Sequence, residues 1–124
     1  MIKAGIPRQF ALLVGAFLIV EGVLELNHST VFGVFATNTT HGVIHLVLGI
    51  VGLLAALKGR ASQFLTFLGA LLLLVGVLWF IPPTRSMPEN FFNVNRAVAI
   101  FNVILGGVSL LVARDGRRHV KPGM

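Results

Sequence analysis

The sequence predicts an all-α, polytopic membrane protein with four transmembrane helices, and three observations favour this fold class. First, the chain has 124 residues, of which 56% are hydrophobic and 11% charged, whereas soluble domains carry about a quarter charged residues. Second, apolar runs of membrane-spanning length occur four times along the chain. Third, most basic residues lie in segments that would share one side of a membrane. We therefore expect a single membrane domain over residues 1–124.

The four apolar runs have the length that a helix needs to cross the hydrocarbon core, about 20 residues at 1.5 Å each. They cover residues 7–26, 39–57, 62–81 and 93–113. Each run is expected to be helical, because unpaired backbone groups are costly in lipid. Pro82 and Pro83 mark the end of the third run, since proline cannot donate a backbone hydrogen bond.

The lysine and arginine residues predict the orientation. Eight of the ten lie at the N-terminus, between the second and third runs, or in a basic tail over residues 114–124, namely Lys3, Arg8, Lys58, Arg60, Arg114, Arg117, Arg118 and Lys121. The other two, Arg85 and Arg96, lie in or beside the third loop. By the positive-inside rule both termini are cytoplasmic. We expect a multi-pass protein of the cytoplasmic (inner) membrane whose loops 27–38 and 82–92 face outward.

The two halves of the sequence resemble each other. Residues 9–26 (QFALLVGAFLIVEGVLEL) align without gaps with residues 63–80 (QFLTFLGALLLLVGVLWF), and residues 44–60 align with residues 101–117. Each half contains two spans, so both halves point the same way through the membrane. The sequence therefore predicts two tandem repeated hairpins related by a pseudo-twofold axis along the membrane normal.

Small residues recur every three or four positions along each span. Lipid tails provide no hydrophobic force between helices, so helices in a membrane associate by close contact at small residues. These stripes predict the interior of a four-helix bundle. The glycines expected to pack the helices are Gly15, Gly22, Gly42, Gly49, Gly52, Gly69, Gly76 and Gly106.

Ionisable residues interrupt the first two spans. Glu21 and Glu25 are four residues apart in the first span, as are His41 and His45 in the second. The rise per residue places Glu21 and His45 at a similar depth, with Glu25 and His41 nearer the outer surface. Ionisable groups inside a membrane usually turn inward and pair. We expect these four residues and Asn102 of the fourth span to form a polar cluster between the hairpins.

Three roles for this polar cluster stay open. A structural role is one, with His45 hydrogen-bonded across the bundle. A proton or ion site is the second, since histidine titrates near neutral pH. The third is a transition metal held by His41 and His45, or a haem or chlorophyll held by one of them. The HxxxH spacing alone is common on helices, so no cofactor is predicted.

The sequence predicts no enzyme, because it contains no serine–histidine–acid set, phosphate-binding loop or nucleotide motif. It also lacks cysteine, which excludes disulfides and thiolate metal sites. The net charge is +6, but the basic residues do not form one face, so no nucleic-acid partner is expected.

A small bundle of this kind favours an accessory or assembly subunit, or a homo-oligomer, with lipid and other membrane subunits as partners. The alternatives are a proton- or ion-conducting oligomer and a metal- or tetrapyrrole-binding protein. Conduction requires a continuous polar path, yet the cytoplasmic halves of the spans are apolar apart from glycine and Ser109.

Two segments carry a family resemblance, FGVFATNTTHGVIHLVLGIVGLLAA (residues 32–56) and NFFNVNRAVAIFNVILGGVSLLVA (residues 90–113). They resemble the small bacterial four-helix membrane proteins of domain-of-unknown-function family 4383. His41, His45, Gly49 and Gly52 match that family's second-span pattern, whereas Asn102 stands where a histidine is usual. The resemblance implies the four-helix membrane fold and carries no assigned activity.

Overall fold

The computed structural model describes the backbone of residues 5–119 and the side chains of residues 5–115. Lys3, Lys121 and the end of the predicted basic tail lie outside these residues. The elements in chain order are α1 (Gly5–Asn27), β1 (Thr30–Val31), β2 (Phe35–Ala36), α2 (Thr39–Leu57), α3 (Ala61–Phe80), η1 (Pro82–Thr84), α4 (Ser86–Phe92) and α5 (Arg96–His119). Four helices are long and apolar enough to cross a membrane: α1, α2, α3 and α5 over Arg96–Asp115. The predicted all-α fold class with four long apolar helices that could span a membrane is thus confirmed.

The fourth helix differs most from its prediction. It begins at Arg96 rather than at residue 93, because Asn93 adopts a left-handed conformation (φ 53°) that ends α4. Asn95 then caps α5, accepting a hydrogen bond from the Val98 amide at 3.0 Å. At its other end α5 continues to His119, so the tail predicted from residue 114 begins as helix. Charged residues ended the apolar pattern there, but they do not stop a helix.

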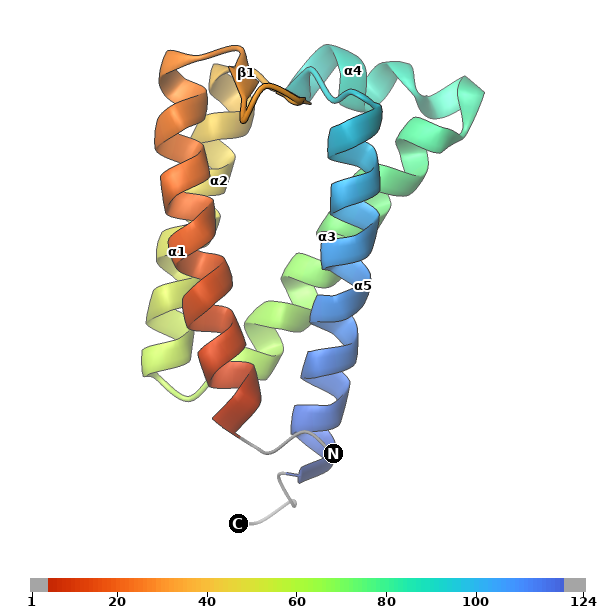
Figure 1. Cartoon of the computed structure of the whole chain (residues 1–124). Helices are drawn as coiled ribbons and strands as arrows, with labels where there is room; N and C mark the ends of the chain where they lie inside the picture. Colours follow the sequence, from red (N-terminus) through yellow and green to blue (C-terminus); the bar gives the residue numbers. More distant parts are fainter. Residues whose placement is uncertain (1–4, 120–124) are drawn as a thin grey trace.

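The two loops on the predicted outer side contain short ordered elements. Residues of the first loop form a small antiparallel hairpin, with Thr30 opposite Ala36 and Val31 opposite Phe35. The second loop contains η1 and α4. Figure 1 shows both at the same end of the molecule, which we call the loop end. The hairpin, η1 and α4 therefore lie over the ends of the long helices at the loop end.

The long helices pack most closely in two pairs, α1 with α2 and α3 with α5. Glycines lie at the closest points of each pair. A Cβ atom on Gly49 would lie 2.6 Å from the Gly15 carbonyl oxygen, and one on Gly106 would lie 2.8 Å from the Gly69 carbonyl oxygen. Neither position has room for a methyl group, so the two helix backbones of each pair are in direct contact. Small residues allow this close contact between helices in membranes.

The other predicted packing glycines also lie at helix contacts. Gly22 and Gly42 face each other within the α1–α2 pair. Gly76 faces Val103 of α5, whereas Gly52 of α2 faces Phe64 of α3 and so contributes to the contact between the pairs.

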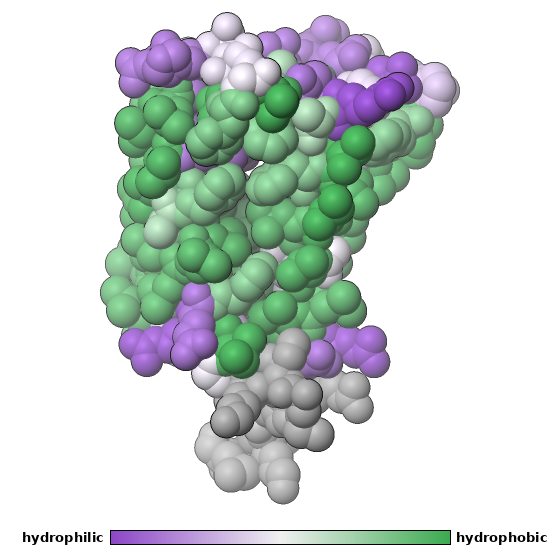
Figure 2. Space-filling view, viewed as in Figure 1, coloured by the Kyte–Doolittle hydropathy of each residue, from purple (hydrophilic) through white to green (hydrophobic). Residues whose placement is uncertain are grey.

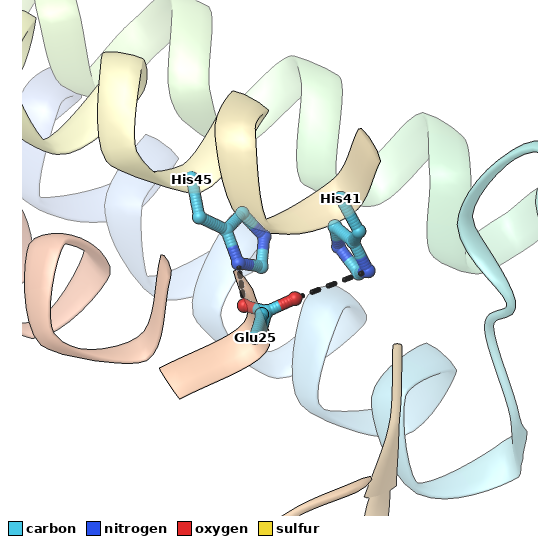
Figure 3. Close-up of side chains that lie close together, drawn as sticks. All are labelled: Glu25, His41 and His45. Atoms are coloured by element: carbon cyan, nitrogen blue, oxygen red, sulfur yellow. Dashed lines mark hydrogen bonds and ion pairs between the residues drawn. The ribbon is translucent and has the colours of Figure 1, made fainter. Parts of the chain in front are cut away.

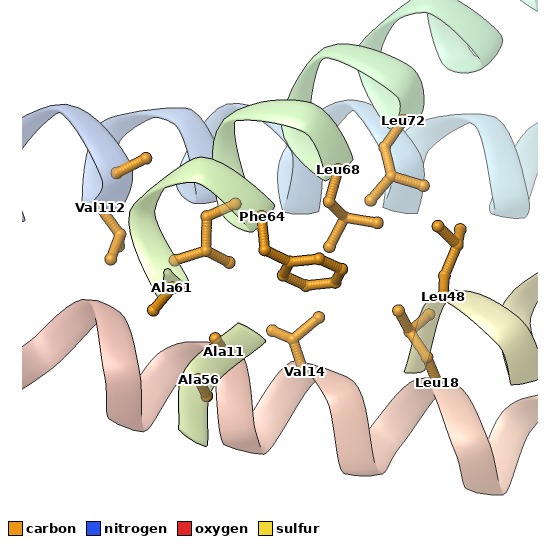
Figure 4. Close-up of a cluster of buried hydrophobic side chains, with 12 residues drawn as sticks. Ala11, Val14, Leu18, Leu48, Ala56, Ala61, Phe64, Leu68, Leu72 and Val112 are labelled. Carbon is orange, nitrogen blue, oxygen red and sulfur yellow. The ribbon is translucent and has the colours of Figure 1, made fainter. Parts of the chain in front are cut away.

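An apolar core joins the two pairs in the half of the molecule opposite the loop end (Figure 4). Leu18, Leu65 and Leu68 are its largest fully buried side chains. Ala56 and Ala61 flank the α2–α3 turn and close the core at that end. Large apolar side chains are exposed on all four long helices, and Figure 2 shows a hydrophobic belt between hydrophilic ends. This surface fits a lipid environment.

Candidate metal centre

The close approach of α1 and α2 brings their ionisable side chains together. A Cβ atom on Gly42 would lie 2.9 Å from the Cβ of Glu25, so the helix carrying His41 touches the turn that carries Glu25. Asn38 fixes the start of α2, because its side-chain oxygen accepts a hydrogen bond from the His41 amide at 2.9 Å. The glycine and the cap together set the depth at which the histidines face the carboxylates.

Four of the predicted site residues meet at this point, and we call Glu21, Glu25, His41 and His45 the Glu/His cluster. The Nδ1 atom of His45 lies 2.5 Å from Oε1 of Glu25 and 2.8 Å from Oε1 of Glu21. The Nδ1 atom of His41 lies 3.6 Å from the other oxygen of Glu25. Figure 3 shows the Glu25 carboxylate bridging the two imidazoles. The carboxylate predicted to lie nearest the surface is therefore the centre of the cluster.

All four side chains are buried, with residue exposures of 3% for Glu25 and 5–6% for the other three. Among the side chains of residues 5–115, no lysine or arginine pairs with either carboxylate. Two ionised carboxylates carry a formal charge of −2, and one imidazolium balances only half of it. Buried charge without a partner is costly, so the Glu/His cluster is suited to hold a cation.

One nitrogen in the cluster lacks a hydrogen-bond partner. The Nδ1 atom of His41 is buried and makes no hydrogen bond, although it faces Glu25. Buried polar atoms are nearly always satisfied, and each exception requires an explanation. A lone pair on this nitrogen would be satisfied by a metal ion.

The donor atoms are close enough to share one ion. One donor atom from each of Glu25, His41 and His45 lies within 4.8 Å of the others. Tetrahedral zinc binds nitrogen and oxygen at about 2.0–2.2 Å, which separates ligand atoms by roughly 3.4 Å. Small rotations of these side chains therefore suffice. Imidazole and carboxylate donors together suit divalent first-row metals.

The available space speaks against a tetrapyrrole. The cavity beside the Glu/His cluster has a volume of about 10 Å³, which holds about one water molecule or ion. A second, mostly apolar cavity on the other side of the two histidines, lined by His41, His45 and Leu48 among others, measures about 100 Å³. Organic ligands generally require pockets of roughly 300 Å³ or more, so the site is the size of an ion rather than of haem or chlorophyll.

Asn102 and Thr37 complete the surroundings. Asn102 of α5 is buried and lines the 10 Å³ cavity, but it makes no hydrogen bond with the Glu/His cluster. Thr37, which was not among the predicted site residues, is buried, and its hydroxyl donates to Oε2 of Glu25. In the sequence, Thr37 is notable only as the residue directly before the Asn38 cap. Its contact with Glu25 could not be predicted without the path of the first loop.

Comparison with known proteins identifies the chain by family. No curated protein and no solved structure matches it significantly. Residues 8–114 match the family described as "Domain of unknown function (DUF4383)". This match covers α2, α3, most of α1 and α5, and the Glu/His cluster, and it confirms the resemblance seen in the sequence. The chain therefore belongs to the DUF4383 family.

Proposed function

We propose that this chain is a non-enzymatic membrane protein that binds one divalent transition-metal ion, of the Zn²⁺ class, in its Glu/His cluster. Glu25, His41 and His45 are the ligands, and Glu21 is the candidate for the fourth. The observation that carries this proposal is the convergence of three buried donor atoms within 4.8 Å of one another. The Nδ1 atom of His41 is consistent with it, because this atom makes no hydrogen bond and lies 3.6 Å from Glu25.

Charge balance supports a divalent ion in particular. A 2+ ion offsets the formal −2 of Glu21 and Glu25 and replaces a proton on His45. Metal ligands must be deprotonated to bind, so such an exchange is the usual chemistry of a His/carboxylate site. A monovalent ion would leave a buried negative charge without compensation.

We also propose that both termini are cytoplasmic and that the Glu/His cluster lies in the outer half of the inner membrane. The distribution of lysine and arginine supports this orientation.

We further propose that the chain consists of two tandem repeated hairpins. Equivalent contacts support this repeat: Gly15 with Gly49 in one helix pair, and Gly69 with Gly106 in the other. Gly15 aligns with Gly69 and Gly49 aligns with Gly106 in the gapless segment alignments, as a pseudo-twofold axis requires.

An accessory or assembly role, alone or as a homo-oligomer, fits this architecture better than conduction through a single chain. Below the Glu/His cluster the described core is apolar, and Ser109 is its one buried polar side chain there. The exposed apolar helix faces are available to lipid and to other membrane subunits. Native mass spectrometry from a mild detergent tests this part. Co-purifying subunits or copies support the accessory role, and a monomer without partners contradicts it.

Titration of purified, chelator-stripped protein with Co²⁺, a coloured substitute for Zn²⁺, tests metal binding. We expect one ion per chain with visible absorption typical of four-coordinate Co²⁺. Glu25→Gln and His45→Ala should each weaken binding roughly a hundredfold or more. Glu89→Gln is the matched control, because Glu89 is an exposed carboxylate of α4. Equal affinities for Glu25→Gln and Glu89→Gln would contradict the proposal.

A further inference from the structure

We propose that the ion reaches the Glu/His cluster from the loop end, through a passage that the hydrogen bond between Thr37 and Glu25 closes. This inference rests on the metal binding proposed above and adds the route and its barrier. Thr37 is thereby assigned as a positioning residue.

An open cavity leads to the cluster from the loop end. It measures about 340 Å³ and is lined by Asn27, His28, Ser29, Asn38 and Thr39, with Glu25 among its walls. These five residues are polar, and four of them are exposed. A hydrated cation can approach Glu25 here without crossing lipid or apolar core. We call this space the loop-end cavity.

Two residues separate the loop-end cavity from the site. Glu25 and Thr37 line both the loop-end cavity and the 10 Å³ cavity beside the histidines, and no other residue lines both. They are also hydrogen-bonded to each other, hydroxyl to carboxylate. The barrier between the loop-end cavity and the histidines is therefore this pair of side chains. An ion that enters must displace the Thr37 hydroxyl from Glu25 or pass beside it.

The second helix pair holds the barrier in place. The Asn93 side-chain amide donates to the Thr37 carbonyl oxygen at 2.9 Å, and the Thr37 amide donates to the Ser29 carbonyl oxygen at 2.9 Å. Thr37 is thus fixed from both sides while its hydroxyl faces Glu25. Asn93, in the α4–α5 junction, belongs to the other half of the chain.

The opposite route is closed by packing. Leu18 of α1 and Leu48 of α2 lie about one turn below Glu21 and His45 and are buried in the apolar core. A divalent ion would lose its hydration among these side chains and gain no ligands. The apolar core therefore provides no route for the ion.

Exchange kinetics test the barrier. Thr37→Val removes the hydroxyl but keeps the branched shape, and we expect Co²⁺ association and release both to accelerate roughly tenfold, as loss of one hydrogen bond to a charged group allows. Thr37→Ser should restore the wild-type rates, and Thr40→Val, at an exposed neighbouring threonine, should leave them unchanged. Unchanged rates in Thr37→Val, or faster release without faster association, would overturn the assignment.

Sidedness tests the route. The chain has no cysteine, so Ser86→Cys at the exposed start of α4 reports the orientation in proteoliposomes through an impermeant maleimide. An impermeant external chelator should strip Zn²⁺ only from molecules whose loop end faces outward. Equal stripping of both orientations would overturn this route. A protein that binds no metal at equilibrium would instead contradict the proposed function itself.

Discussion

The two helix pairs share their glycine contacts but differ at the loop end. In the gapless alignments of the first spans and of the second spans, with the latter extended back to His41, the residues Glu21, Glu25, His41 and His45 correspond to Val75, Trp79, Val98 and Asn102. Three of those positions belong to a small apolar cluster, in which buried Val98 packs with Val75 and Trp79, whereas Asn102 is a buried polar residue. One pair therefore has four ionisable side chains where the other has three apolar side chains and an amide.

This difference shows that the close packing of a helix pair and the Glu/His cluster are separate features of the molecule. The second pair packs without buried charges, so close helix packing of this type does not require them. Replacing buried ion pairs by apolar residues of similar size is often neutral or stabilising. The Glu/His cluster is therefore better explained by a ligand than by a need for stability.

The largest expected effect comes from making the first pair resemble the second. The combined variant Glu21→Val, Glu25→Gln, His41→Val and His45→Asn should lose metal affinity by roughly a thousandfold or more, since two imidazoles and both carboxylates are removed. Its metal-free form should melt no lower than the metal-free wild type. Isothermal titration with Zn²⁺ and thermal melting in detergent measure both. A metal-free variant that melts well below the metal-free wild type would contradict the conclusion that the ionisable residues are not needed for folding.

The glycine contacts provide the next largest effect. Gly49→Val and Gly106→Val each place a branched side chain against a facing carbonyl, and overpacking of this kind costs about 1–3 kcal/mol. Both should lower the melting temperature, but only Gly49→Val should also weaken metal binding, because it moves α2 away from α1 one turn from His45. Gly107→Ala is the control, since a Cβ there meets nothing within 4 Å. Equal loss of metal affinity in Gly106→Val would argue against two separable pairs.

The first pair alone should make metal binding depend on pH. Protons compete with the ion for His41, His45 and the two carboxylates, so affinity should fall as the pH is lowered, by about tenfold per pH unit for each proton displaced. Co²⁺ titrations at pH 7.5, 6.5 and 5.5 measure this slope. An affinity that does not change over this range would mean that the imidazoles are not ligands.

The smallest effect concerns the link between the pairs. Asn93→Asp keeps a residue that tolerates the left-handed conformation but removes the amide that donates to Thr37. Loss of this single hydrogen bond should lower stability by about 1 kcal/mol. Thermal melting compared with Asn90→Asp, at an exposed position of α4, isolates the effect. Identical melting temperatures would show that the contact does not join the two halves.

Most of the fold could be predicted because lipid restricts the choices. The second helix occupies the predicted residues 39–57, and the first and third begin and end within two residues of prediction. The start of α5 was missed because it depends on the left-handed turn at Asn93, which the apolar pattern does not contain. The strands β1 and β2 have two residues each, too few to produce a periodic signal.

The site was predictable in part for the same reason. Helical spacing and depth were sufficient to bring Glu21 and Glu25 toward His41 and His45. The position of the Glu25 carboxylate between the two imidazoles and its hydrogen bond with Thr37 could not be predicted without the path of the first loop. Asn102 was expected in the polar cluster, but its side chain lines the cavity without bonding to the four ionisable residues.

X-ray absorption at the zinc edge, on wild-type protein loaded with one Zn²⁺ per chain, shows directly whether the Glu/His cluster binds the metal. We expect a four-coordinate ion with imidazole scattering from two histidines, and carboxylate oxygens at about 2.0–2.2 Å. A six-coordinate shell of oxygens without imidazole scattering, or failure to retain the ion after gel filtration, would contradict metal binding by this cluster.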